Sequence, residues 1–253
     1  MNVPGTQVAL TFISVPIGEH CPLYYDTSEG SLNLASVNPG NSYQLYVGGK
    51  GGNGQFHDDL QDAGQQKVDD YAARHQALAA KVTQNGDSAA ETYQYVDPMR
   101  FSYALVNKLN PNSYEGVCFV DVFDPTLCPK NNSKNAAMLY LAPPDGSNYP
   151  KEADFLAAIK AAATYVVGTI AGYNALAAKQ GLPVIEVLRS CLFSSNIYNP
   201  ARILPAKIAA AIFAGYFQEL QAQDSGISEL QLPYSSDKND PLFAAIQANM
   251  TTN

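Results

Sequence analysis

The sequence predicts an α/β protein whose mixed, partly parallel sheet is covered by helices on both faces. Short apolar runs recur along the chain, and segments with helical periodicity lie between them. Several of these runs are apolar without alternation, which is typical of strands buried on both faces of a sheet. With 253 residues and 46% hydrophobic content the chain can bury one core, which favours a single domain over residues 1–253.

Apolar runs that end near Pro, Gly or Asn predict the strands. The first run, QVALTFISV, is rich in β-branched residues and is closed by Pro16, and the second is closed by Asn38-Pro39-Gly40. We expect strands at residues 7–15, 32–37, 116–123, 136–142, 184–193 and 228–234.

Two longer segments carry an apolar stripe at helical spacing. The stripe over residues 55–84 ends at Asn85-Gly86, and Gly64 leaves open a division into two shorter helices. Residues 154–179 form an Ala-rich helix whose expected buried side consists of Phe155, Ile159, Val166, Val167, Ile170 and Tyr173.

An N-capping residue followed by proline predicts further helix starts. Proline is tolerated at the first helical position because its missing N–H would have no intrahelical acceptor there. The dipeptides Asp97-Pro98, Asn199-Pro200 and Asp240-Pro241 therefore predict helices at about residues 98–109, 200–223 and 241–250.

The acidic composition argues against one broad class of partner. The formal charge of -8 and the pI near 4.8 disfavour a nucleic-acid-binding surface, which needs clustered Lys and Arg. No apolar run approaches the roughly 20 residues that span a bilayer. Residues 1–11 lack the basic start and apolar stretch of a secretion signal. We therefore expect a soluble cytoplasmic or nuclear protein that binds neither nucleic acid nor a membrane.

The cysteines predict neither a metal site nor a cofactor. Cys21, Cys118, Cys128 and Cys191 form no close pair, and three histidines are too few to complete a structural zinc site. Cys118 and Cys191 sit within apolar runs, so we expect buried free thiols.

A glycine-rich loop before the first predicted helix indicates an anion site. Glycines at 48, 49, 51, 52 and 54 let backbone N–H groups close around an anion, and the N-terminus of the next helix adds a favourable dipole. A diphosphate fits this arrangement. The chain has no GxxxxGK[ST], and no GxGxxG follows its first strand with an acidic residue about 20 positions on. A flexible loop or hairpin is the alternative.

A second loop, SSNIYNP at residues 194–200, follows a predicted buried strand and precedes a predicted helix. Open α/β sheets bind ligands at the carboxyl ends of their strands. We therefore expect the two loops to face each other across one crevice.

Taken together, these segments resemble the signatures of the macrodomain family, the ADP-ribose-binding modules. The family carries a VNAAN strand end, a glycine run of the form GGGGVDGxIH and a late loop of the form STGIYGFP. The corresponding segments here are VNPGN at 37–41, GGKGGNGQFH at 48–57 and SSNIYNP at 194–200. The resemblance implies a three-layer α/β/α, macrodomain-like fold, with surplus length in insertions at 16–31 and 85–135.

The resemblance also implies a site for ADP-ribose or an ADP-ribosylated protein. Asn41 matches the asparagine that contacts the distal ribose, and Asn38 matches the structural asparagine before it. The positions matched to the two diphosphate loops are Gly48, Gly49, Gly51 and Gly52, and Ser194, Ser195, Asn196, Ile197 and Tyr198.

Several positions depart from the family pattern. Asn53 stands where the hydrolases carry a water-orienting aspartate, and an amide cannot act as a base. The adenine-selective aspartate has no counterpart after the first strand. Asp58 and Asp59 resemble the paired acids of the poly(ADP-ribose) glycohydrolase branch and are candidate general acids, or simply an acidic first helical turn. Lys50 is more readily assigned to phosphate neutralisation than to a Schiff base with the ribose.

Three hypotheses follow. The first is a macrodomain-like binder of ADP-ribose or a related nucleotide diphosphate, with or without hydrolysis of ADP-ribosyl esters. The second is a degenerate macrodomain fold that has lost the ligand and acts as a protein-interaction or scaffold domain. The third is an unrelated α/β-hydrolase-like enzyme, for which the sequence offers no GxSxG elbow and no His and acid to pair with Ser194 or Ser195.

Overall fold

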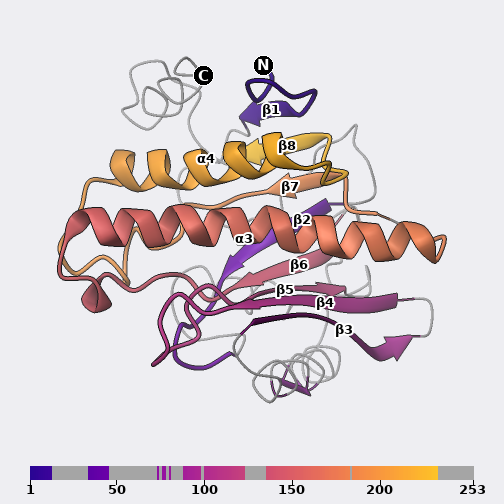
Figure 1. Ribbon diagram of the computed structural model, residues 1–253, viewed down its shortest axis with the longest axis horizontal. Helices are drawn as coiled ribbons and strands as arrows, with labels where there is room; N and C mark the ends of the chain where they lie inside the picture. Colours follow the sequence, from indigo (N-terminus) through magenta and orange to yellow (C-terminus); the bar gives the residue numbers. More distant parts are fainter. Residues whose placement is uncertain are drawn as a thin grey trace.

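An eight-stranded sheet organises the chain, in the order β1-β8-β7-β2-β6-β5-β4-β3 (Figure 1). The computed structural model describes residues 1–12, 34–45, 73, 76–77, 80, 88–97, 100–122, 135–182 and 184–232. The strands are β1 (Ala9–Phe12), β2 (Leu34–Pro39), β3 (Ser88–Asp97), β4 (Arg100–Asn107), β5 (Cys118–Val122), β6 (Asn135–Leu141), β7 (Val187–Arg189) and β8 (Glu229–Leu232).

The sheet is mixed, as the sequence predicts. β1, β8, β7, β2 and β6 are parallel neighbours. β6, β5, β4 and β3 pair antiparallel. The segment predicted as an insertion at 85–135 thus contributes β3, β4 and β5 to this sheet, and residues 16–31 lie outside the described part of the chain.

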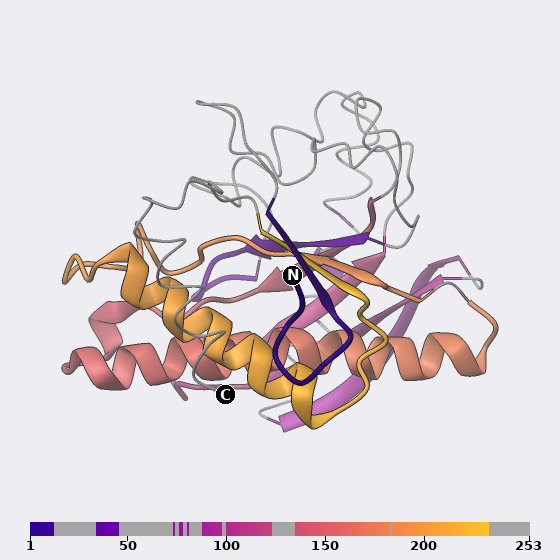
Figure 2. The same cartoon turned by 90° about the horizontal axis from the view of Figure 1, so that it is seen from above.

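Two long helices, α3 (Glu152–Lys179) and α4 (Pro205–Ala222), lie side by side against one face of the sheet (Figures 1 and 2). The predicted buried side of α3 is confirmed, since Phe155, Ile159, Val166, Val167, Ile170 and Tyr173 are all buried. By length and composition α3 could cross a membrane, but 56% of its most apolar window is buried within the protein. It therefore belongs to the core.

The predicted helix over 55–84 falls mostly outside the described residues. Ala73, Gln76, Ala77 and Ala80 are helical and exposed. These four positions are three and four residues apart and so share one face of a helix. On a helix, this exposed face lies opposite the positions of the predicted apolar stripe.

Close backbone contact locks α3 against α4. A Cβ on Gly215 of α4 would lie 2.3 Å from the Lys160 carbonyl oxygen and 2.7 Å from the Ala163 Cβ of α3. On the opposite flank of α3, a Cβ on Gly172 would lie 2.3 Å from the Tyr103 ring of β4. Glycine is needed at these crossings because the neighbouring backbone or ring occupies the side-chain space.

The helix predicted at 98–109 is wrong, because this segment is strand β4 and pairs antiparallel with β3. Asp97 pairs with Arg100 across the connection. Asp followed by Pro is also preferred at the start of a β-turn, so the dipeptide is compatible with either element. Tertiary pairing with β3 and β5 decides in favour of the strand.

The helix predicted to start at Pro200 begins five residues later, at Pro205. The Asn199 carboxamide accepts a hydrogen bond from the Ile203 N–H at 2.8 Å and donates to the Ile203 carbonyl at 2.8 Å. This local turn delays the helix, and Pro205 takes the early position that tolerates proline. The strand predicted at 184–193 is shorter, at Val187–Arg189, and the helix predicted at 241–250 lies outside the described residues.

The two described cysteines are free thiols, and the expected burial is complete for Cys118 and partial for Cys191. Burial raises the pKa of both Cys118 and Cys191 to about 12. Both thiols are therefore protonated and unreactive near neutral pH. Cys21 and Cys128 fall outside the described ranges, and within those ranges no cluster of His, Cys, Asp and Glu could hold a metal.

Replacing Gly215 by alanine will lower the free energy of unfolding by about 2 kcal/mol, because overpacking costs more than the roughly 1 kcal/mol gained in helix propensity. Urea unfolding of Gly215→Ala measures the change. The control is Gln218→Ala on the exposed side of the same helix, which will be neutral or slightly stabilising. Equal stability of Gly215→Ala and the parent would contradict the close helix crossing.

Candidate functional site

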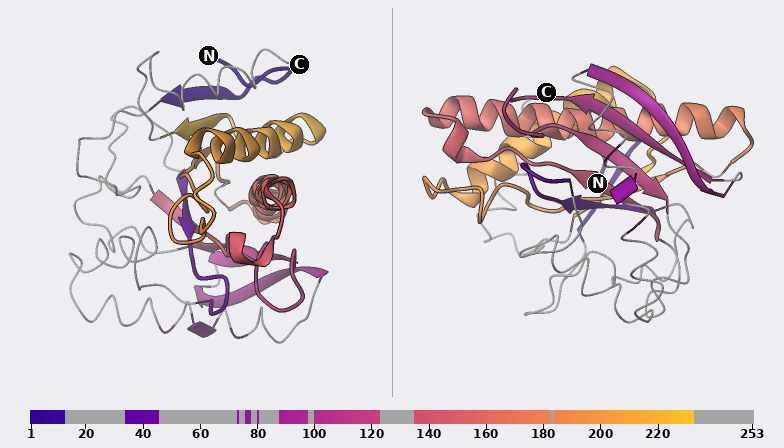
Figure 3. Two further views of the ribbon diagram at one scale, coloured as in Figure 1. Left: turned by 90° about the vertical axis from the view of Figure 1, so that its left-hand side faces the viewer. Right: turned by 90° about the horizontal axis from the view of Figure 1, so that it is seen from below.

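The loops that follow β2, β6 and β7 meet at one edge of the sheet, because these strands are parallel. The segment before β5 joins them, since β5 is antiparallel to β6. We call this region the loop edge and define it as residues 40–45, 108–117, 142–151 and 190–204. Figure 3 (left) looks onto it. The amino ends of α3 and α4 lie at this edge.

The loop after β2 is held by Asn41, the residue matched to the distal-ribose contact. Its Oδ1 accepts hydrogen bonds from the N–H groups of Tyr43 at 2.8 Å and Gln44 at 2.9 Å. Such a turn is typical of asparagine in loops. The Asn41 carboxamide oxygen therefore stabilises its own loop. Asn38 is fully buried and donates to the Met138 Sδ at 3.1 Å, which fits a structural role.

A tyrosine fills the space inside this turn. The Tyr140 hydroxyl accepts from the Asn41 N–H at 2.8 Å, and its ring stacks on Phe119 with centroids 4.8 Å apart. A Cβ on Gly40 would lie 2.0 Å from this ring. Gly40 is thus required by the close approach of Tyr140, which occupies the concave side of the loop.

The second loop, residues 194–200, is also bonded within the protein. The Ser194 hydroxyl donates to the Pro144 carbonyl at 2.7 Å, and the Ser195 hydroxyl donates to the Leu192 carbonyl at 2.7 Å. Ser194 adopts a left-handed φ of 59°, which a non-glycine residue rarely takes. Both hydroxyls that were matched to phosphate contacts therefore help to fix the loop.

The second loop, residues 194–200, contacts the loop after β2 directly. The Tyr198 hydroxyl accepts from the Ser42 N–H at 3.3 Å, and the Tyr198 carbonyl accepts from the Gly146 N–H at 2.9 Å. The Ser42 hydroxyl donates to the Pro143 carbonyl. Tyr198 thus joins residues 194–200 to the loop after β2, and the glycine-rich loop that is predicted to face it lies outside the described residues.

A buried polar network that the sequence did not predict joins three segments of the loop edge. Glu115 is fully buried and accepts from the Tyr149 hydroxyl at 2.6 Å and from the Asn148 Nδ2. Asn148 Nδ2 also donates to the Tyr43 hydroxyl at 3.1 Å. The turn-forming stretch DGSN at 145–148 is a signal for a loop, but nothing in the sequence indicates that Glu115 is its partner.

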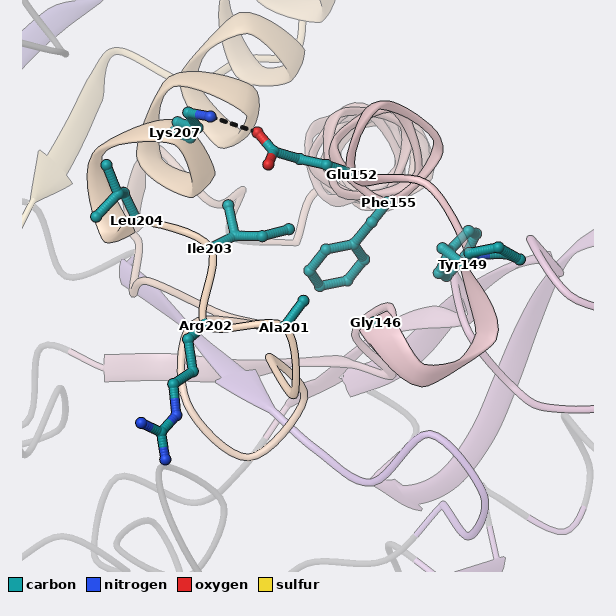
Figure 4. Close-up of a pocket in the computed structure, with 10 residues that line it drawn as sticks. Gly146, Tyr149, Glu152, Phe155, Ala201, Arg202, Ile203, Leu204 and Lys207 are labelled. Carbon is teal, nitrogen blue, oxygen red and sulfur yellow. Dashed lines mark hydrogen bonds and ion pairs between the residues drawn. The ribbon is translucent and has the colours of Figure 1, made fainter.

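A pocket of about 230 Å³ opens beside the loop edge, between the amino ends of α3 and α4 (Figure 4). The Phe155 ring and Ile203 form its apolar wall, and the ion pair of Lys207 with Glu152, at 2.6 Å, crosses its rim. Arg202 points away from this ion pair. The lining residues are Gly146, Tyr149, Pro150, Glu152, Phe155, Ala201, Arg202, Ile203, Leu204 and Lys207.

Comparison with known proteins identifies the sequence family. A family model described as the Mitochondrial association factor 1 C-terminal domain matches residues 106–238, which is more than half of the chain. The chain belongs to this family. The macrodomain resemblance therefore holds for the fold, whereas the sequence family is that of the association factor.

Two relatives are similar to most of this chain. The "DNA/RNA-binding protein ALBA4" of Plasmodium falciparum is 30% identical over 197 residues, covering 72% of this chain and 52% of that protein. The "Mitochondrial association factor 1 form a1" of Toxoplasma gondii is 25% identical over 197 residues, covering 70% of this chain and 44% of that protein. The chain thus spans about half the length of these relatives.

Solved structures support the predicted fold class. A mutant macrodomain of Oceanobacillus iheyensis, solved with ADPR, aligns over 98% of this chain and 94% of its own, with a TM-score of 0.50. The sequences are 11% identical. At this identity the likeness shows the fold alone, and the α/β macrodomain-like fold predicted from the sequence is confirmed.

Large apolar side chains of this family member stand exposed around the loop edge. Tyr43 is 47% exposed, Ile197 61% and Leu204 64%. Tyr43 and Ile197 each neighbour a residue of the Ser42–Tyr198 hydrogen bond, and Leu204 lines the pocket. All three of these exposed side chains lie within the loop edge.

The predicted site residues divide into two groups. Asn41, Ser194, Ser195, Asn196, Ile197 and Tyr198 lie at the loop edge, and Asn38 is buried in β2 just before it. Gly48, Gly49, Lys50, Gly51, Gly52, Asn53, Asp58 and Asp59 lie outside the described residues, and their roles stay predictions.

Replacing Asn41 by alanine will lower the free energy of unfolding by about 1–2 kcal/mol, because two loop N–H groups lose their acceptor. Thermal and urea unfolding without any ligand measure the change. Asn196→Ala, at an exposed position of the neighbouring loop, is the control and will stay within about 0.5 kcal/mol of the parent. Unchanged stability of Asn41→Ala would contradict the structural role.

Proposed function

We propose that this chain is a protein-association module that docks its partner through the loop edge of a macrodomain-like fold. The observation that supports it best is the set of exposed large apolar side chains at this edge, Tyr43, Ile197 and Leu204. The side chains of Asn41, Ser194 and Ser195 form hydrogen bonds with backbone groups of the loop edge itself. Opening this arrangement for a ligand would break bonds each worth about 1 kcal/mol.

The exposed apolar side chains supply the driving force for docking. Burying an Ile or Leu side chain contributes about 1.5–3 kcal/mol, and Ile197 and Leu204 are both mostly exposed. The pocket lined by Phe155 and Ile203 lies next to Leu204 and offers an apolar recess for a partner side chain. Binding energy at protein interfaces is concentrated in a few such anchors.

The proposed partner is a protein at the surface of mitochondria. The family description and the Toxoplasma relative both name mitochondrial association. The Plasmodium relative is named as a DNA/RNA-binding protein, but the net charge of -8 makes a protein partner the better proposal for this chain.

Ile197→Asp will weaken association with mitochondria at least tenfold, because docking would then remove the added charge from water. Co-sedimentation of the purified chain with isolated mitochondria that retain intact outer membranes measures this. Gln218→Asp adds the same charge at an exposed position of α4 outside the loop edge, and serves as the control that keeps binding. Equal binding of Ile197→Asp and the parent would exclude the loop edge as the docking surface.

ADP-ribose binding is the second candidate function. It is supported by the placement of Asn41 and Tyr198 at the same edge of a macrodomain-like fold, where the sequence places the distal ribose. Under this reading Asn53 supplies no catalytic base, so the module would recognise ADP-ribose rather than hydrolyse an ester.

Isothermal titration with ADP-ribose, alongside ADP and AMP, decides between the two candidates. The association proposal predicts no saturable heat up to millimolar ligand, because the side chains of Asn41, Ser194 and Ser195 already bond within the protein. Micromolar ADP-ribose binding that is lost in Gly52→Glu would instead establish the second candidate.

A further inference from the structure

Glu115 is a fully buried carboxylate at the loop edge, just before β5. A buried charge is costly unless charge-assisted hydrogen bonds satisfy it. Here the Tyr149 hydroxyl donates to one carboxylate oxygen at 2.6 Å, and Asn148 donates to the other. Both donors come from the segment that follows β6, so Glu115 fastens that segment to the one before β5.

The bonds continue from Glu115 to the surface. Asn148 Nδ2 also donates to the Tyr43 hydroxyl at 3.1 Å, and this hydroxyl donates to the Asp145 Oδ2 at 2.9 Å. Asp145 in turn caps the short helix η2 (Gly146–Asn148) by accepting from the Ser147 N–H at 2.9 Å. Tyr43 is thereby held by its hydroxyl while its ring stays partly exposed.

The tyrosine hydroxyls remain donors near neutral pH. Burial raises the pKa of Tyr149 above its ordinary range, and the hydrogen bond and charge of Glu115 raise it further. Partial burial, with a smaller contribution from Asp145, raises the pKa of Tyr43. Both hydroxyls thus keep their protons. The direction of the hydrogen bonds that they donate to Glu115 and Asp145 is therefore fixed.

Backbone bonds tie the same segments together. The Leu109 N–H donates to the Glu115 carbonyl at 2.7 Å, and the Tyr114 N–H donates to the Ser42 carbonyl at 2.7 Å. The segment that carries Glu115 therefore contacts the Tyr43 loop both through its backbone and through Asn148. We therefore expect a substitution of Glu115 to alter the position of Tyr43 and to leave the helices unchanged.

We infer that Glu115 is a positioning residue for the association surface, which holds the exposed Tyr43 ring and its loop in place through Asn148 and Tyr149. The surface itself rests on the proposed function. The positioning by Glu115 is a property of the free chain and can be measured without a partner.

Hydrogen exchange of individual backbone amides tests the positioning. Glu115→Gln keeps the side-chain size but replaces one acceptor oxygen with an NH₂ group that faces another donor. We expect exchange at Tyr43 and Gln44, whose N–H groups bond to Asn41, to accelerate at least tenfold, with the core amides of α3 unchanged. Glu219→Gln on α4 is the control and leaves all these amides unchanged.

Tyr149→Phe is the second variant, and it keeps the inference testable if Glu115→Gln does not fold. It removes one donor to Glu115 and should give the same local acceleration. Exchange within twofold of the parent in the folded variants would overturn the inference. Equal acceleration in the loop and in α3 would also overturn it, since that result marks loss of global stability.

Binding to mitochondria separates this inference from the proposed function. Both variants should lose at least fivefold in affinity, and faster exchange with full affinity would overturn the role of Glu115 in the association surface. A parent chain that does not bind mitochondria would instead overturn the proposed function. In that case the exchange data still decide whether Glu115 positions the loop.

Discussion

The fold depends on β2, which is buried between two parallel neighbours, β6 and β7. Parallel pairing on both sides satisfies its backbone and brings the carboxyl ends of all three strands to one edge. Long crossovers then return over the sheet as α3 and α4, which Gly215 allows to pack closely. The loop edge is thus a product of strand direction, and every candidate functional residue in the described ranges lies there because of it.

The loop edge retains the geometry of a ligand-binding fold but uses its polar groups internally. Tyr140 fills the first loop from beneath, Tyr198 bridges the two loops, and Glu115 ties a third segment to them. These bonds leave apolar side chains, Ile197 and Leu204 among them, as the exposed features of the edge. One fold can serve unrelated functions, so the function of this chain must be argued from the side chains at its loop edge.

The errors in the sequence prediction have a common physical origin. Asp97-Pro98 and Asn199-Pro200 each favour a helix start locally, but the same residues also favour turns. At Asp97 the pairing of β3 with β4 settles the choice, and at Asn199 a carboxamide bonded to Ile203 does so. In both places the observed structure depends on specific contacts, which the helix and turn preferences of the residues do not describe.

The sequence by itself predicted the α/β class, most of the strands, the buried side of α3 and two of the segments at the loop edge, those around Asn41 and at residues 194–200. It could do so because apolar periodicity reports burial directly. Only the tertiary structure decided that Tyr140 lies under Gly40, that Tyr198 reaches Ser42 and that Glu115 is satisfied by Tyr149 and Asn148. Hydrogen-bond partners such as Ser42 and Tyr198, 156 positions apart, are set by strand register and loop packing, and no local pattern encodes them.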